Sequence, residues 1–141
     1  IFPEATISRS FEIKELKTGA VRMAAEAGVP LIPMVTWGTQ LLKTKDHESD
    51  LKSRGKTIGL HVGAPLDVTG ADPVAETAQL RAAMSALLDK AIAEYPISPE
   101  GQWWAPARHG GTAPTLEQAA KLDEEELIAR AARRAAKKEQ S

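Results

Sequence analysis

The residues best suited to chemistry lie within the first nineteen positions of the chain. Glu4, Thr6, Ser8 and Arg9 stand close together, and Lys17 follows shortly before a helical pattern begins. A hydroxyl-rich, basic loop can hold a phosphate, because cationic side chains neutralise the anion and a helix N-terminus offers unpaired N–H groups. A carboxylate among these bases is poorly placed for phosphate alone, but it can accept hydrogen bonds from ligand hydroxyls. The pattern therefore indicates a ligand that carries both a phosphate and hydroxyl groups.

Strands and helices in alternation are expected to position this loop. Residues 1–2 run into Pro3, which suits the end of a strand because proline has no N–H to donate. Residues 16–27 carry one apolar helical stripe, and residues 31–37 form a short apolar run typical of a strand covered on both faces. A helix between two such strands is a right-handed crossover. Ligands of such folds bind beyond the carboxyl ends of the strands, where Glu4 falls.

The middle of the chain predicts a loop, a strand and a long helix. Residues 43–56 are almost all charged and are expected to form a solvated loop. Residues 57–63 alternate apolar residues with glycine and His61, which predicts a half-covered strand with His61 on the opposite face, as a surface or packed residue rather than a ligand. Asp72 is expected to cap a long amphipathic helix that packs on the sheet and stops at Pro96.

The C-terminal third predicts a connection followed by a helical tail. Residues 96–114 are rich in proline and glycine and contain Trp103 and Trp104. Their indoles are expected to cover the core, with a membrane interface as the alternative. Thr115 and Gln118 have the spacing of a capping box. The helix that follows is acidic at its start and basic at its end, and the basic end is either a solvated terminus or a contact to anionic headgroups.

Composition excludes several classes of function. The chain has 141 residues, a net charge of -1 and no cysteine. One domain is expected, with no global field that attracts nucleic acid and with no thiol catalysis, cysteine zinc site or disulfide scaffold. No apolar run approaches the ~20 residues that a membrane span needs. Neither a G-x-S-x-G elbow nor a Walker loop is present.

Three motifs in order resemble those of one family. Residues 2–8 (F-P-E-A-T-I-S) resemble the F-P-E-G-T-R-S block of the glycerolipid acyltransferases, the superfamily of lysophosphatidate and glycerol-3-phosphate acyltransferases. Residues 16–20 (L-K-T-G-A) resemble the F-K-x-G-A that follows it, and residues 29–33 (V-P-L-I-P) resemble the V-P-x-x-P block. The resemblance covers about the first 65 residues well and the remainder loosely.

The resemblance implies an α/β fold whose mainly parallel sheet is incomplete here and is followed by a C-terminal helical tail. Residues 1–95 would be the C-terminal part of an acyltransferase α/β domain, 96–114 a connection rich in Pro, Gly and Trp, and 115–141 the tail. The implied enzyme resembles a 1-acylglycerol-3-phosphate O-acyltransferase of phospholipid biosynthesis. It would transfer a fatty acyl group from acyl-CoA or acyl-carrier protein, a co-substrate rather than a cofactor, to a hydroxyl of lysophosphatidate or a related glycerol phosphate.

The resemblance also implies roles for individual residues. Glu4 would hold the hydroxyls of the acceptor, while its phosphate would be bound by four residues, Thr6, Ser8, Arg9 and Lys17. No metal or nucleic acid is expected to bind. The protein is expected at the cytoplasmic face of a membrane, as a peripheral protein that contacts the membrane surface.

The first motif departs from the family pattern at two positions. Ala5 replaces the family glycine, and Ile7 replaces the arginine that is expected to touch the acceptor phosphate. Arg9 lies two positions further on. Because alternate side chains of an extended loop project to the same side, Arg9 is hypothesised to supply the missing charge.

The family's H-x4-D block, which carries the catalytic histidine, is absent. None of His47, His61 and His109 has an aspartate five positions later. The chain is therefore expected to be the C-terminal part of something longer, to contain no catalytic residue, and to bind without turnover. The alternative is a non-catalytic module that binds anionic lipid headgroups, and an H-x4-D block upstream would distinguish the two.

Overall fold

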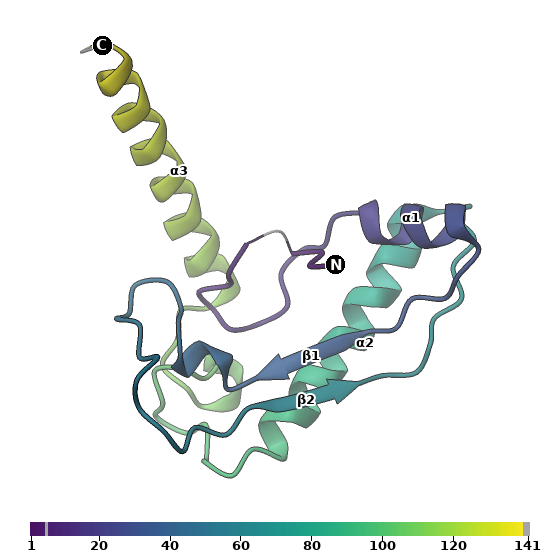
Figure 1. Cartoon of the computed structure of the whole chain (residues 1–141), viewed down its shortest axis with the longest axis horizontal. Coiled ribbons are helices and arrows are strands. Elements are labelled where there is room, and N and C mark those ends of the chain that lie inside the picture. Colours follow the sequence, from purple (N-terminus) through teal and green to yellow (C-terminus); the bar gives the residue numbers. More distant parts are fainter. Residues whose placement is uncertain (5, 140–141) are drawn as a thin grey trace.

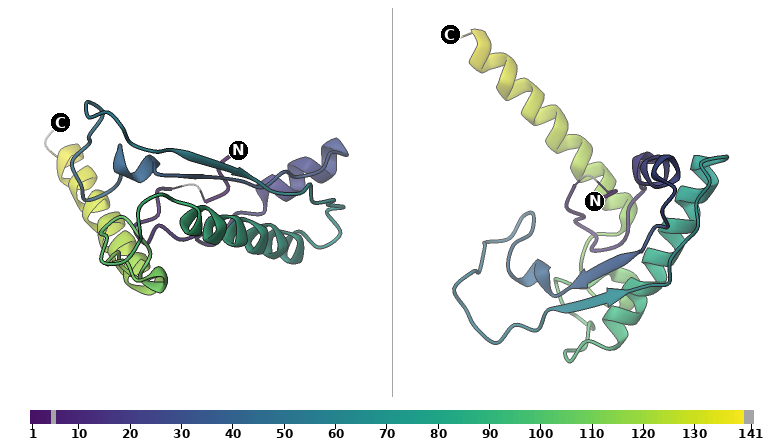
Figure 2. Two further views of the ribbon diagram at one scale, coloured as in Figure 1. Left: turned by 90° about the horizontal axis from the view of Figure 1, so that it is seen from below. Right: turned by 45° about the vertical axis from the view of Figure 1, so that its right-hand side comes forward.

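The computed structural model of the chain describes residues 1–4 and 6–139. Its helices and strands, in chain order, are α1 (Gly19–Ala27), β1 (Met34–Trp37), β2 (Gly59–Val62), α2 (Pro73–Ala93) and α3 (Leu116–Glu139) (Figure 1). Two short 3-10 helices, η1 (Thr39–Leu41) and η2 (Ala107–His109), lie in the connections. The two strands form an antiparallel ribbon, and α2 lies along one face of it as a second layer (Figure 2).

Helix α1 is short because Gly28 and Pro30 follow its last residue and end the helix. Gly28 takes a left-handed conformation with φ 64°, and its N–H bonds to the carbonyls of the last turn. This C-cap is the one that the glycine before Pro30 predicted. The buried side of the helix is formed by small residues, Ala20, Val21 and Ala24, so that α1 packs closely on α2.

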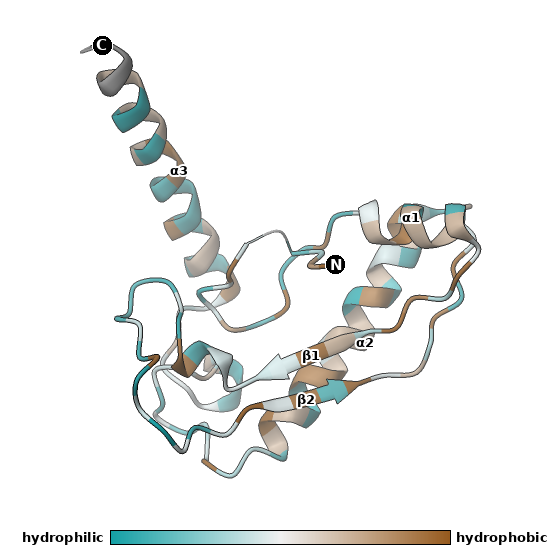
Figure 3. Cartoon of the chain, in the orientation of Figure 1, coloured by the Kyte–Doolittle hydropathy of each residue, from teal (hydrophilic) through white to brown (hydrophobic). Residues whose placement is uncertain are grey.

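Helix α2 forms as predicted, with Asp72 at its N-cap. The Asp72 carboxylate accepts hydrogen bonds from the N–H groups of Val74 at 3.2 Å and Ala75 at 3.0 Å. Its buried residues recur along the helix, which packs on both strands, and the ribbon of α2 carries several apolar segments (Figure 3). The core comprises Ile13, Ala20, Val35, Trp37, Leu80, Met84, Leu88, Ala91, Ile92, Trp104 and Ala105.

The connection after α2 covers the core, as predicted. Trp104 is buried and meets Tyr95 and Trp37 edge to face, with ring centroids 5.5 and 6.2 Å away. Trp103 is partly exposed and stacks on His47 with a centroid distance of 3.9 Å. Such aromatic contacts add about 0.5–1.5 kcal/mol each beyond area burial. The aromatic cluster therefore attaches residues 96–114 to the β-ribbon.

The strand at 57–63 is confirmed in part, as β2, but its covered face is the opposite of the one expected. Leu60 and Val62 are more than half exposed, whereas His61 lies on the side of α2 and is largely covered. The cause is steric. A Cβ at Gly63 would lie 3.0 Å from Leu87 of α2. Because glycine has no Cβ, α2 can pack closely against the face of β2 on which Gly63 lies.

The described residues contain antiparallel pairing alone, so the mainly parallel sheet remains a prediction. The outer edge of β1 is unpaired there, which is where a further strand could add. Residues 1–3, expected to end a strand, have no regular secondary structure. Within residues 1–4 and 6–139, no helix has both the length and the apolar character of a membrane span.

Two glycines with positive φ make a matched pair for testing backbone constraint. A Cβ at Gly38 (φ 97°) would lie 2.2 Å from the Thr57 carbonyl oxygen, whereas a Cβ at Gly28 would meet nothing within 4 Å. We expect Gly28→Ala to lower the free energy of unfolding by about 1 kcal/mol, and Gly38→Ala by roughly 3 kcal/mol because a clash adds to the strain. Urea denaturation measures both. Equal losses would show that the approach of residue 57 to Gly38 does not constrain the fold.

Candidate functional site

An open cavity of about 710 Å³ lies between the N-terminal segment, β1 and α2. Three of the five predicted site residues, Glu4, Thr6 and Ser8, line this cavity. Apolar side chains make up much of the rest, including Phe2, Ile7, Phe11, Met34, Leu60, Met84 and Leu88. A cavity lined both by polar groups and by many apolar side chains suits an amphiphile better than a small polar metabolite.

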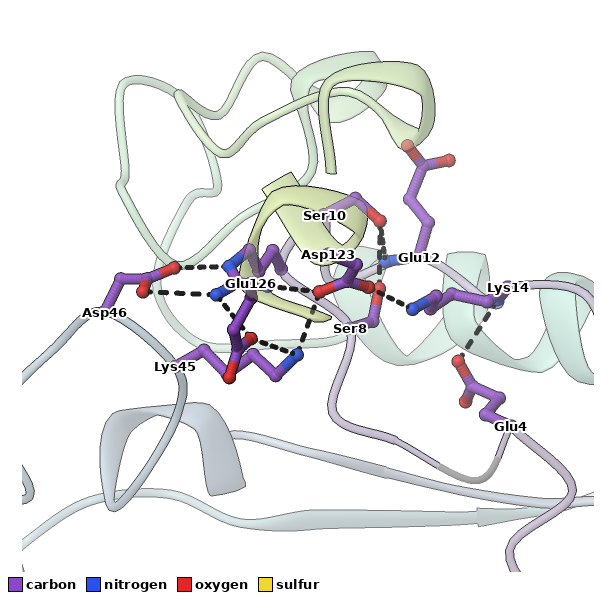
Figure 4. Close-up of polar contacts among 10 residues, drawn as sticks. Glu4, Ser8, Ser10, Glu12, Lys14, Lys45, Asp46, Asp123 and Glu126 are labelled. Carbon is purple, nitrogen blue, oxygen red and sulfur yellow. Dashed lines mark hydrogen bonds and ion pairs between the residues drawn. The ribbon is translucent and has the colours of Figure 1, made fainter. Parts of the chain in front are cut away.

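Glu4 is half-buried at this cavity and is held by the chain that follows it. One carboxylate oxygen accepts the backbone N–H of Lys14 at 3.1 Å (Figure 4). Burial raises the pKa of Glu4 above its usual value, although the Lys14 N–H and the charges of Lys14 and Arg81 oppose the rise. The side chain is therefore fixed at the cavity wall, and it does not pair with Arg9.

Arg9 points into a cluster of acids instead of the larger cavity. Its guanidinium donates to Asp46 at 2.5 Å and to Glu126 at 2.9 Å, and it also contacts Asp123. Only 9% of Arg9 is exposed. The expectation that Arg9 projects to the same side as Ile7 is not met, since Ile7 lines the cavity and Arg9 does not. Its role in binding the acceptor phosphate stays a prediction.

Asp123 of α3 is the centre of this ionic cluster. Its carboxylate contacts Lys14 at 2.5 Å and Lys45 at 2.8 Å in addition to Arg9 (Figure 4). Burial acts to raise the pKa of Asp123, but hydrogen bonds from the two lysines outweigh it and lower the pKa to about 2. Lys45 also lies 3.2 Å from Glu126. We call these six residues, Arg9, Lys14, Lys45, Asp46, Asp123 and Glu126, the ionic cluster.

Backbone strain accompanies the ionic cluster. Phe11 and Asp46 are the non-glycine residues with positive φ among those described, at 56° and 62°. Both border a small cavity of about 190 Å³ that Arg9, His47 and Trp103 also line. Strained residues persist only where surrounding contacts hold them, and they gather at functional sites. Two of them beside one arginine support a functional role for this region.

Other predicted or candidate residues lie elsewhere. The Lys17 side chain is exposed and lines neither cavity, while its backbone N–H donates to the Pro3 carbonyl at 3.0 Å. Among the described residues, no histidine lines the larger cavity. His61 lies 3.7 Å from Glu94, and His109 lies 3.0 Å from Asp89. No group of three or more metal-binding side chains occurs in the described part of the chain.

Two buried polar atoms belong to residues that line the larger cavity and were missed by sequence reasoning. Trp37 Nε1 and Thr44 Oγ1 have no hydrogen-bond partner among the described residues, although both side chains are more than nine-tenths buried. A buried donor without a partner costs about 1–3 kcal/mol. Trp37 ends an apolar run and Thr44 lies in a charged one, so neither residue type pointed to this cavity.

Comparison with known proteins agrees with the motifs. Residues 1–37 match the family model described as Acyltransferase. A 1-acyl-sn-glycerol-3-phosphate acyltransferase of Chlamydomonas reinhardtii is 34% identical over 84 residues, which cover 60% of this chain and 25% of the relative. The chain thus spans about a quarter of the length of the curated relative it matches. No solved structure matches this chain.

These findings confirm the resemblance to the glycerolipid acyltransferases, which rests on residues 1–37 for the family model and on 84 residues for the Chlamydomonas enzyme. The matched residues 1–37 contain the predicted site residues, α1 and β1. They do not include α3, which supplies Asp123 and Glu126 to the ionic cluster.

The lowered pKa of Asp123 predicts how stability depends on pH. Because its folded pKa is about 2, below the ordinary value of 3.8, its ion pairs stabilise the fold above about pH 4 and are lost as pH falls toward 2. We expect the wild type to lose about 1–2 kcal/mol from this group over that range, and Asp123→Asn to lack this loss. Urea midpoints measured from pH 5 to pH 2.5 test it, with Glu124→Gln as the control on the same helix. Parallel profiles for Asp123→Asn and wild type would contradict the prediction.

Proposed function

We propose that the protein takes part in acyl transfer from acyl-CoA or acyl-carrier protein to a hydroxyl of lysophosphatidate or a related glycerol phosphate. In this proposal the chain supplies the acceptor-binding side of the site. The observation that carries it is the convergence of Glu4, Thr6 and Ser8 on one cavity. These three residues lie in the segment that matches the Acyltransferase family model.

The residues at the cavity suit an acceptor with three chemical parts. The Glu4 carboxylate can accept hydrogen bonds from glycerol hydroxyls. The hydroxyls of Thr6 and Ser8 can donate to phosphate oxygens, and Ser8 already shares a hydrogen bond of 2.9 Å with Ser10. The apolar remainder of the cavity suits an acyl chain. Holding the hydroxyl in a reactive orientation is positioning work, which can lower the barrier by several kcal/mol.

The reaction needs a general base to take the proton of the attacking hydroxyl. In the mechanism that the resemblance implies, a histidine paired with aspartate does this, and the alkoxide attacks the thioester carbonyl. No histidine lines the larger cavity in the described part of the chain. We therefore assign binding and orientation of the acceptor to these residues, and not proton transfer.

Glu4→Gln tests the role of the carboxylate. We expect the dissociation constant for sn-glycerol 3-phosphate to rise about tenfold, since the amide is a weaker acceptor for hydroxyls, while that for inorganic phosphate stays unchanged. The amide oxygen can still accept the Lys14 N–H, so the fold should hold. Isothermal titration measures both ligands. Glu15→Gln, an exposed acid nearby, is the matched control. An equal effect on both ligands, or none, would refute the role of Glu4.

The 141-residue chain alone should show no transferase activity, because none of its described histidines reaches the cavity. We expect thiol release from acyl-CoA with lysophosphatidate to match the rate without protein. The chain has no cysteine, so a thiol assay carries no background from the protein. Turnover that disappears in His47→Gln would identify a base here and would overturn the expectation.

A second candidate is a non-catalytic module that binds anionic headgroups. The observation that favours it is the direction of α3, which extends away from the rest of the molecule (Figures 1 and 2). Arg130, Arg133 and Arg134 are exposed on this helix, which is where attraction to an anionic surface would act. Vesicle binding that needs these arginines, together with no affinity for glycerol 3-phosphate, would favour this candidate over the first.

A further inference from the structure

Three cations from two separate segments converge on one carboxylate. Arg9 and Lys14 come from the N-terminal segment, and Lys45 comes from the loop after η1. All three contact Asp123, which comes from α3 and is only 17% exposed at its side chain. Two lysines and an arginine around one pair of oxygens are the arrangement that proteins use for phosphate groups.

The charges of the ionic cluster show what the three cations would bind without α3. In the structure they face three carboxylates, Asp46, Asp123 and Glu126. Two of these belong to α3. If the helix moves away, the cations face Asp46 alone, and the net charge becomes about +2. A phosphate monoester carries about -1.5 to -2 at pH 7, which matches this charge.

We propose that Arg9, Lys14 and Lys45 form a binding site for a phosphate monoester, and that α3 occupies this site in the free protein through the carboxylate of Asp123. Glu126 supports the occupied state through Arg9 and Lys45. A ligand phosphate and the helix therefore compete for the same cations. Helix α3 acts as a displaceable plug whose release opens the site.

The site lies beside the group proposed to hold the glycerol hydroxyls. The backbone N–H of Lys14 donates to Glu4, while the ammonium group of the same residue contacts Asp123 (Figure 4). One lysine residue, through its backbone and its side chain, thus links Glu4 to the proposed phosphate site. The proposal rests on the proposed function, because the phosphate is taken to be that of the acceptor. The proposal adds Lys14 and Lys45 to Arg9 and Lys17, the cations predicted from the sequence. It also assigns to α3 the role of occupying the phosphate site in the free protein.

The first experiment measures whether phosphate moves α3. Since the chain has no cysteine, spin labels can be placed at Met23→Cys on α1 and Leu127→Cys on α3, both of which replace exposed side chains. Inorganic phosphate is added at constant ionic strength, with chloride as the balancing anion, so that screening of the ion pairs stays fixed. We expect the interlabel distance distribution to shift with phosphate and to stay unchanged with chloride.

The second experiment measures competition. We expect Asp123→Asn combined with Glu126→Gln to lower the dissociation constant for phosphate at least tenfold, because the plug loses its charge. Glu124→Gln combined with Glu125→Gln removes the same charge from exposed positions of the same helix and should leave the constant unchanged. Lys45→Gln should raise the constant about tenfold, whereas Lys52→Gln, exposed in the same loop, should not. Circular dichroism checks that each variant folds. If the double variant Asp123→Asn with Glu126→Gln does not fold, the interlabel distance measured with phosphate in the otherwise unchanged chain decides whether α3 is displaced.

The outcomes separate this proposal from the proposed function. Phosphate binding without a change in the interlabel distance, and with equal constants for the two double variants, would overturn the plug. If glycerol 3-phosphate still bound in a manner that depends on Glu4, the acceptor site would stand without it. If neither phosphate nor glycerol 3-phosphate bound to the wild type or to the Asp123→Asn, Glu126→Gln variant, both the plug and the proposed acceptor site would be overturned.

Discussion

The arrangement of this molecule depends on neutralising the cations of its N-terminal segment. Arg9 is nearly buried, and a buried guanidinium is stable only when hydrogen-bonded carboxylates surround it. The partners come from the loop after η1 and from α3, at the far end of the chain. Breaking one such pair leaves an uncompensated charge and costs several kcal/mol. The ionic cluster therefore attaches the N-terminal half of α3, through Asp123 and Glu126, to the rest of the molecule.

The features that the sequence predicted correctly are those decided within a few residues. Asp72 caps α2, Gly28 ends α1, and Thr115 exchanges hydrogen bonds with Gln118 at the start of α3, because each depends on local backbone geometry. Glu4, Thr6 and Ser8 of one short, continuous motif line the same cavity, and their binding of an acceptor stays a prediction. Local rules and a motif were enough for these elements.

The features that sequence reasoning missed depend on long-range contacts. Arg9 has partners 37, 114 and 117 positions away, and no pattern in the first nineteen residues indicates them. Lys45 lies in a charged run that is expected to be solvated, and only the fold brings it to Asp123. The alternation of apolar residues predicts that Leu60 and Val62 face the core, and this prediction is wrong because α2 packs on the opposite face of β2. Gly63 leaves the room that Leu87 of α2 needs, and this glycine is visible in the sequence.

The left-handed backbone conformations of Phe11 and Asp46 store strain energy next to the ionic cluster. Each non-glycine residue in that conformation stores about 1–2 kcal/mol, and both stand next to members of the cluster or belong to it. Asp46 pairs with Arg9, and the same guanidinium contacts Asp123 and Glu126 of α3. If α3 is displaced as proposed, Arg9 loses two of its three carboxylate partners, and relaxation of the backbone at Asp46 would lower the free energy needed for the displacement.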